Sequence, residues 1–145
     1  MRLRLATVAD ADAIAAVFTV SFARLTYLPR LHTAEEDRAY LRGVLVRGDE
    51  VWVAEDEGRI QGFAHLHEHV LEHLYVHPDA QGGGIGSKLM VRLKERRPEG
   101  FELWVFQRNE GARRFYERHG MRLVRLTDGA GNEEREPDAL YEWRP

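Results

Sequence analysis

The 145-residue chain contains no cysteine. Disulfides, thiolate metal ligands and a cysteine nucleophile are therefore excluded, because each needs a thiol side chain. No apolar run approaches the roughly 20 residues that a membrane-spanning helix needs. The N-terminal stretch MRLRLATVAD lacks the apolar segment and the small-residue cleavage site of a secretory signal. These absences predict a cytoplasmic protein that does not enter a membrane.

Apolar residues make up 43% of the chain and charged residues 31%, which is the composition of a globular protein. A chain of 145 residues can bury one hydrophobic core, so we expect a single domain over residues 1–145. The formal net charge of −3 gives no reason to expect nucleic-acid binding. A basic run from Arg92 to Arg97 is interpreted as the solvated face of a helix.

Hydrophobic periodicity predicts alternating strands and helices. A strand is expected at 2–6, a hairpin with a glycine turn at 50–69, and further strands at 70–76, 101–106, 121–126 and 139–143. Helices are expected at 7–22, 33–48, 85–97 and 109–120. This order favours an α/β (α+β) protein in which helices cover both faces of a mixed sheet.

Two helix starts carry capping signals. Thr7 or Asp10 can accept hydrogen bonds from the first turn of the first helix. Thr33 followed by Glu36 is a capping-box pattern before the second helix.

The stretch LEHLYVHPDAQGGGIGSKLM, residues 71–90, passes from a strand through three consecutive glycines into a helix. A helix start has free N–H groups and partial positive charge, and glycines let an anion approach these groups closely. Two familiar phosphate loops do not fit. A P-loop needs Gly-Lys-Ser/Thr where this chain has Gly86-Ser87-Lys88, and a dinucleotide fingerprint needs a third glycine where Ser87 or Leu89 stands.

The pattern Gln/Arg-x-x-Gly-x-Gly/Ala does fit, through Gln81, Gly84 and Gly86. Further along, NEGARRFYERHGMRLV is similar to the signature Asn-x-x-Ala-x-x-Phe-Tyr-x-x-x-Gly-Phe, with Met121 in place of the aromatic residue. With these two motifs in order, the chain resembles the GNAT superfamily of acetyl-CoA-dependent N-acetyltransferases over nearly its whole length. The resemblance implies a mostly antiparallel central sheet of six to seven strands with helices on both faces.

The resemblance also implies acetyl-CoA as the co-substrate, without a metal ion. Leu74, Tyr75 and Val76 would line its pantetheine arm, and the N–H of Val76 would polarise the thioester carbonyl. Asn109, flanked by Ala112 and Arg113, would hydrogen-bond the cofactor near the pantetheine. The pyrophosphate cradle would consist of Gln81, Gly82, Gly83, Gly84, Ile85, Gly86 and Ser87.

Two side chains are candidates for proton transfer. Tyr116 occupies the position of the family's general acid, although an aromatic pair such as Phe115 and Tyr116 can also simply pack in a core. Glu72 precedes Leu74 by two residues, so strand alternation predicts that it shares a face with Leu74 and Val76, opposite His73. This resembles a base position in some family members; a carboxylate without a role and a base formed by a water chain are the alternatives.

Two other groups of residues are candidates for binding a metal ion or the acceptor. His65, His67 and His69 alternate along a strand and could share one face as metal ligands, but the family chemistry needs no metal. The segments 27–32 and 133–138 resemble those that wall the acceptor pocket, and the second is acidic enough to attract a cationic amine.

The combined interpretation is an N-acetyltransferase that transfers acetyl directly to an amine within a ternary complex, since no cysteine can carry the acetyl group. The acceptor stays open between a small amine or amino-acid derivative and a peptide or protein amine. A non-catalytic CoA-binding sensor or scaffold is the alternative function, and a nucleotide-binding protein is a third. A homodimer is also open, because residues 140–143 could pair across an edge strand.

Overall fold

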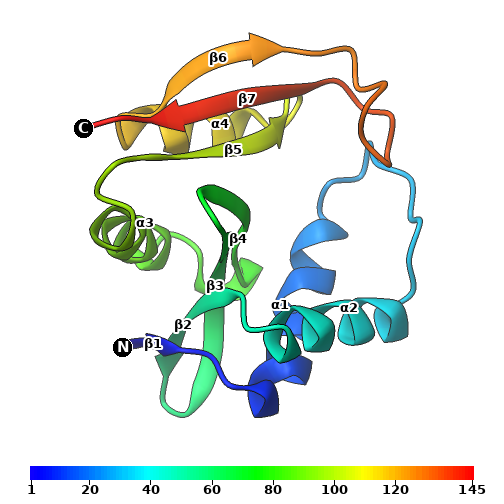
Figure 1. The fold of residues 1–145 in the computed structure, drawn as a ribbon. Helices are drawn as coiled ribbons and strands as arrows, with labels where there is room; N and C mark the ends of the chain where they lie inside the picture. Colours follow the sequence, from blue (N-terminus) through cyan, green and yellow to red (C-terminus); the bar gives the residue numbers. More distant parts are fainter.

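The computed structural model describes residues 1–145 and contains one sheet of seven strands in the order β1-β2-β3-β4-β5-β7-β6 (Figure 1). Only β4 and β5 run parallel to each other, and all other neighbours are antiparallel. The predicted mixed, mostly antiparallel sheet is therefore confirmed. The strands are β1 (Arg2–Leu5), β2 (Glu50–Asp56), β3 (Arg59–His67), β4 (Val70–Val76), β5 (Phe101–Phe106), β6 (Arg122–Leu126) and β7 (Asp138–Trp143).

Helices cover both faces of the sheet, as predicted (Figure 1). Helices α1 (Ala11–Phe22) and α2 (Ala34–Val46) pack on one face, and α3 (Ile85–Arg96) and α4 (Glu110–Arg118) on the other. Alternation along β2 supplies both cores: Val51 and Val53 face α1 and α2, whereas Ala54 faces α3. No helix is both long enough and apolar enough to cross a membrane.

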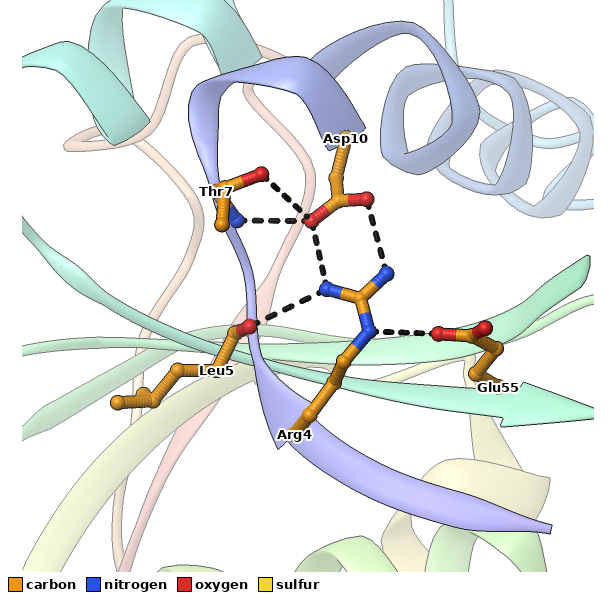
Figure 2. Close-up of polar contacts among 5 residues, drawn as sticks. All are labelled: Arg4, Leu5, Thr7, Asp10 and Glu55. Atoms are coloured by element: carbon orange, nitrogen blue, oxygen red, sulfur yellow. Dashed lines mark hydrogen bonds and ion pairs between the residues drawn. The ribbon is translucent and has the colours of Figure 1, made fainter. Parts of the chain in front are cut away.

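The first predicted helix is split into the 3₁₀ helix η1 (Val8–Asp10) and α1. Asp10 is the N-cap residue of α1, but its side chain does not make the expected hydrogen bond to the first turn of this helix. Its carboxylate accepts instead from the N–H of Thr7 at 2.7 Å and from both terminal nitrogens of Arg4 at 2.8 and 3.0 Å. Figure 2 shows Arg4 held between Asp10 and Glu55, so that one side chain joins β1, β2 and the start of α1.

The capping box of the second helix is confirmed. The N–H of Glu36 donates to the hydroxyl of Thr33 at 3.1 Å, and the N–H of Thr33 donates to the carboxylate of Glu36 at 2.9 Å. This reciprocal pair satisfies two donors at the helix start and fixes where the chain leaves the long connection after α1.

The prediction that residues 140–143 form an edge strand is wrong. Strand β7 lies between β5 and β6, and β6 forms that edge of the sheet. The last strand in sequence, β7, pairs with β5, and the earlier strand β6 lies on the outer side of β7. Sequence order alone does not reveal such an insertion, because both strands have similar apolar patterns.

Strands β4 and β5 separate soon after they meet. Their parallel pairing consists of Val70 with Glu102 and Leu71 with Leu103. Beyond Leu71, β4 continues along β3 and β5 continues along β7. The sheet therefore opens between the carboxyl-terminal halves of β4 and β5, and the candidate site lies at this opening.

Candidate active site

The end of β4 has backbone N–H groups that do not hydrogen-bond to β3. Just beyond the strand, the N–H of His77 donates to the carbonyl of Gln61 on β3 at 2.7 Å. Because the direction of hydrogen bonding alternates along an antiparallel strand, the N–H groups of Leu74 and Val76 point away from β3. They face the side from which β5 has separated, so a ligand entering there can bind them.

A β-bulge interrupts the pairing of β3 with β4 at Glu72. His73 lies opposite His65 and Leu71 lies opposite Leu66, which leaves Glu72 as the extra residue. A bulge of this kind shifts the alternation of side chains by one position. The residues before and after Glu72 therefore do not follow one continuous pattern.

The predicted placement of Glu72 is wrong for this reason. Leu74 and Val76 pack toward the core beneath α3. Glu72 lies instead on the side of α1 and α2, where it lines a cavity together with His73 and Tyr75. Glu72 and His73 are thus neighbours at one cavity rather than residues on opposite faces.

The glycine loop combines unusual backbone angles with open space. Gly82 and Gly84 both have φ of +85°, and a Cβ atom at either position would meet nothing within 4 Å. Gly84 directly precedes α3, and the buried Ile85 anchors the first turn of this helix. The loop therefore exposes backbone N–H groups without side chains above them, and an anionic pyrophosphate fits this arrangement.

Gly86 has a different role from the exposed glycines before it. A Cβ atom at this position would lie 3.2 Å from the ring of Phe115 on α4. The start of α3 and the middle of α4 are thus in close contact. Next to it, the hydroxyl of Ser87 lies 3.1 Å from Nε2 of His119, which also joins the two helices.

Gln81 connects the loop to the end of β4. Its side-chain amide donates to the carbonyl of Val76 at 3.2 Å, and the hydroxyl of Ser21 lies 3.4 Å from the same oxygen. The Gln81 side chain thus fixes the loop relative to β4.

Asn109 caps helix α4. Its side-chain oxygen accepts from the N–H of Ala112 at 3.3 Å, and its amide NH₂ group is free to donate to a ligand. Ala112 packs against the core beneath α3 and α4. The guanidinium of Arg113 turns inward to the hydroxyl of Tyr141 at 3.1 Å.

Tyr116 is 8% exposed and belongs to the same core cluster that Leu74 and Val76 contact. Burial raises the pKa of its phenol above the ordinary value. The side chain is therefore protonated at neutral pH and can donate a proton. The centre of its ring lies 5.5 Å from that of Phe115. Tyr116 is thus both a core residue and a candidate proton donor.

A cavity of about 620 Å³ opens on the other side of β4. Its walls come from α1, the connection to α2, the ends of β4 and β5, and the loop before β7. The predicted wall segments contribute residues 28–32 and 133–134. Sequence reasoning missed the aromatic lining, whose members come from separate elements: Phe18, Phe22, Tyr40, Trp104 and Phe106.

The cavity has an excess of carboxylates, with five acidic residues against Arg30 and His32: Glu36, Asp37, Glu72, Glu133 and Glu134. His32 lies 2.6 Å from Glu133 and 3.7 Å from Glu36, and the hydrogen bond with Glu133 raises the pKa of His32. Glu134 has no cationic partner, and its partial burial raises its pKa. The cavity therefore favours a cation.

Only two of the three alternating histidines meet, and they do so at a carboxylate. Nε2 of His65 lies 2.7 Å from Asp49, and Nδ1 of His67 lies 3.2 Å from the same carboxylate. His69 lies beyond the end of β3, in the turn before β4. No group of three or more histidine or acidic side chains in the structure has a geometry that could hold a metal ion.

The basic run on α3 is occupied by contacts within the chain. The guanidinium groups of Arg96 and Arg97 donate to Glu50 at 2.8 and 3.1 Å, and Lys94 donates to the carbonyl of His119 at 2.5 Å. Arg92 lies over the ring of Trp52, 4.4 Å from its centre. These cations stabilise the packing of α3 and do not form a free basic patch.

Known proteins resemble this chain in sequence. The family model for the acetyltransferase (GNAT) domain matches residues 47–122. The chain is 32% identical to an uncharacterized N-acetyltransferase of Archaeoglobus fulgidus, with 92% of this chain and 100% of that protein covered. It is 36% identical to the peptidyl-lysine N-acetyltransferase YiaC of Escherichia coli, but the match covers 50% of each chain. For the L-amino acid N-acyltransferase MnaT of E. coli, 33% identity extends over 64% of this chain and 60% of the relative.

Solved structures share the fold over almost the whole chain. A GCN5-related N-acetyltransferase from Rhodopseudomonas palustris has a TM-score of 0.82 at 24% identity, covering 99% of this chain and 95% of that one. The structure of yncA from Salmonella typhimurium with its cofactor acetyl-CoA has a TM-score of 0.77 at 23% identity, covering 99% and 93%.

Proposed function

This chain belongs to the GNAT acetyltransferase family, and from this premise we propose that residues 1–145 form one N-acetyltransferase domain. In this proposal, the domain transfers the acetyl group of acetyl-CoA to a primary amine. The observation that supports it best is the opening between β4 and β5 beside the glycine loop. Free strand N–H groups and free helix N–H groups occur there together, as a ligand with a thioester and a pyrophosphate requires.

The cofactor would bind mainly to the backbone. The pantetheine would lie along Leu74, Tyr75 and Val76, in the place that a neighbouring strand would otherwise fill. The pyrophosphate would lie against the N–H groups of residues 81–87, and the amide of Asn109 would bind the arm from the side of α4. Acetyl-CoA supplies the activated acyl group, and the protein supplies orientation and proton transfer.

Three groups of the protein would assist the chemistry. The N–H of Val76 would stabilise the negative charge on the carbonyl oxygen, and loss of such a donor typically costs about 3 kcal/mol of barrier. Tyr116 would protonate the departing thiolate. Glu72 would accept a proton from the amine, directly or through water, since it lies at the cavity and not in the core.

The acceptor would be a small cationic amine with an apolar body. A cavity of about 620 Å³ is of the size that encloses small molecules. Its aromatic walls suit an apolar or cationic group, and its carboxylates would repel a free amino-acid carboxylate. The relatives named for peptidyl-lysine and for L-amino acids make a peptide amine and an amino-acid derivative the two comparison substrates.

The decisive experiment measures thiol release from acetyl-CoA with a panel of small amines, amino acids and lysine peptides. Turnover with cationic amines supports the proposal, and turnover with peptides alone would reassign the acceptor. Binding of CoA without turnover across the panel would favour the non-catalytic sensor or scaffold. Thermal stabilisation by ATP or NAD but not by CoA would favour a nucleotide-binding protein.

A further inference from the structure

A pair of histidines, one fully buried and one half-buried, lies between the cavity and the connection from α2 to β2. His65 on β3 is fully buried and directly opposite His73 on β4, with the two ring centres 5.6 Å apart. Nε2 of His65 contacts Asp49 at 2.7 Å, whereas its Nδ1 is buried without any hydrogen-bond partner. An unpaired buried nitrogen destabilises the fold, so its retention calls for an explanation.

Protonation states follow from the surroundings of each group. The hydrogen bond from Arg47, followed by those from His65 and His67, holds the pKa of Asp49 well below its usual value, so this carboxylate is ionised. Burial lowers the pKa of His65, and its neutral ring then donates through Nε2–H to Asp49. The lone pair of Nδ1 is left as a free acceptor, and the centre of the His73 ring lies 5.6 Å from that of His65.

His73 continues the series toward the cavity. Its Nε2 lies 3.0 Å from the hydroxyl of Tyr40, and both residues line the cavity. Burial lowers the pKa of His73, so this ring is also neutral. When Tyr40 donates to Nε2, the N–H of His73 is on Nδ1. Every hydrogen bond in the series can thus point from the cavity toward Asp49.

We propose that Tyr40, His73, His65 and Asp49 form a proton relay from the acceptor cavity to the surface. One water molecule can bridge two rings at this spacing, and the unpaired Nδ1 of His65 is the acceptor that such a bridge needs. At the far end, Asp49 contacts Arg47 and His67, whose side chains are 53% and 46% exposed. The relay therefore begins at the substrate and ends at solvent.

The charged and titratable neighbours of the relay are compatible with proton movement. Glu72 lies close enough for its charge to act on both Tyr40 and His65. Tyr75, on the same strand, stacks on His73 with the two ring centres 6.0 Å apart. The remaining neighbours of His73 are the apolar rings of Phe18 and Phe63. Glu72 thus supplies a negative charge near the entrance, and aromatic rings pack against His73.

The relay rests on the proposed acetyl transfer, which must dispose of one proton. As the C–N bond forms and the C–S bond breaks, the ammonium nitrogen loses two protons. One balances the proton that Tyr116 gives to the thiolate, and the other leaves the site. While an acceptor fills the cavity, Glu72 would take this second proton and pass it to the oxygen of Tyr40.

The transfer then continues by exchange along the series. Tyr40 gives its hydroxyl proton to Nε2 of His73, and His73 gives its Nδ1 proton to Nδ1 of His65 through the bridging water molecule. His65 gives its Nε2 proton to Asp49, which releases it to solvent beside His67. Both rings return to their starting tautomers when the product has left and water enters the cavity.

A matched pair of substitutions tests the relay. In His65→Gln, the amide nitrogen can keep the donor to Asp49 and the amide oxygen can still accept a hydrogen bond, but the side chain can no longer take up a proton at one atom while it releases another. We expect kcat for acetyl transfer to fall about tenfold with little change in KM, in the range of single proton-transfer groups, and added imidazole buffer to restore part of it. Tyr40→Phe should give the same loss and the same rescue. His69→Gln, in the exposed turn, should leave kcat unchanged.

Three results would overturn the relay. An active parent protein whose His65→Gln variant has the parent kcat across the pH range would exclude the relay and leave the proposed function intact. If the His65→Gln variant loses kcat together with melting temperature, and imidazole does not restore kcat, His65 has a structural role only. Absence of thiol release by the parent with every amine would exclude the proposed function and the relay with it.

Discussion

Gly86 at the start of α3 lies directly against Phe115 on α4, so that a Cβ atom would come within 3.2 Å of the ring. Gly86→Ala should therefore push the glycine loop away from α4. We expect a loss of stability of about 1 to 3 kcal/mol, as for other overpacked sites, and weaker binding of CoA. Calorimetric titration of CoA and urea unfolding measure the two effects.

Gly43→Ala is the matched control for this substitution. Gly43 lies within α2, away from the glycine loop, and a Cβ atom there would meet nothing within 4 Å. CoA affinity should not change, and stability should not fall, because alanine favours a helix over glycine. If the Gly43 variant loses as much CoA affinity as the Gly86 variant, the contact of Gly86 with α4 is not what limits binding.

Glu72→Gln tests the proposed base. The substitution keeps the size of the side chain but removes its basicity, so kcat should fall at least about tenfold. Glu68→Gln in the adjacent turn is the control. A Glu72 variant with the rate and pH profile of the parent would assign deprotonation to water or to another side chain.

Tyr116→Phe separates proton donation from core packing. The ring and its contact with Phe115 are kept, so the melting temperature should change by no more than a few degrees. Loss of the phenolic proton should lower kcat by about 100-fold with little effect on KM for acetyl-CoA. Because burial raises the pKa of Tyr116, the parent enzyme should not lose activity through this group at any pH below about 10. Unchanged kcat in the variant would make Tyr116 a packing residue only.

Much of the fold was predictable because hydrophobic periodicity and turn residues act locally. The strand and helix positions, the capping box at Thr33 and the turn at Gly58 all depend on neighbours in sequence. The insertion of β7 between β5 and β6 was not predictable, because it depends on which strands meet after the chain has crossed α4.

The candidate site was also predictable only in part. The glycine loop is one continuous segment, and glycine favours the positive φ angles found at Gly82 and Gly84. Its geometry could therefore be predicted from the sequence. The bulge at Glu72 has no sequence signal, and it moved this residue from the expected face to the cavity. The contact of His73 with Tyr40 joins β4 to α2 and depends wholly on that shift and on tertiary packing.

Glu134→Gln tests whether the cavity selects a cation. Glu134 lines the cavity and has no cationic partner, so its loss should raise KM for a cationic amine about threefold and leave kcat unchanged. High salt should reduce this difference, because salt screens exposed charges. Glu35→Gln, which removes a charge from α2 outside the cavity, is the control. An equal rise in KM for both variants would indicate a general effect of net charge.

The pair of Arg4 and Asp10 makes stability depend on pH. The hydrogen bonds from Arg4 lower the pKa of Asp10 from 3.8 to about 2, so the folded state favours the ionised carboxylate. Such a shift corresponds to about 2 kcal/mol that is present above pH ~4 and is lost as pH falls through about 2. Arg4→Gln should lower the free energy of unfolding by about this amount at pH 7, and the difference from the parent should shrink toward pH 2. Urea unfolding at both pH values measures it, with Arg2→Gln on the exposed end of β1 as the control. If Arg4→Gln costs as much at pH 2 as at pH 7, the side chain stabilises β1 and α1 through packing and not through its charge.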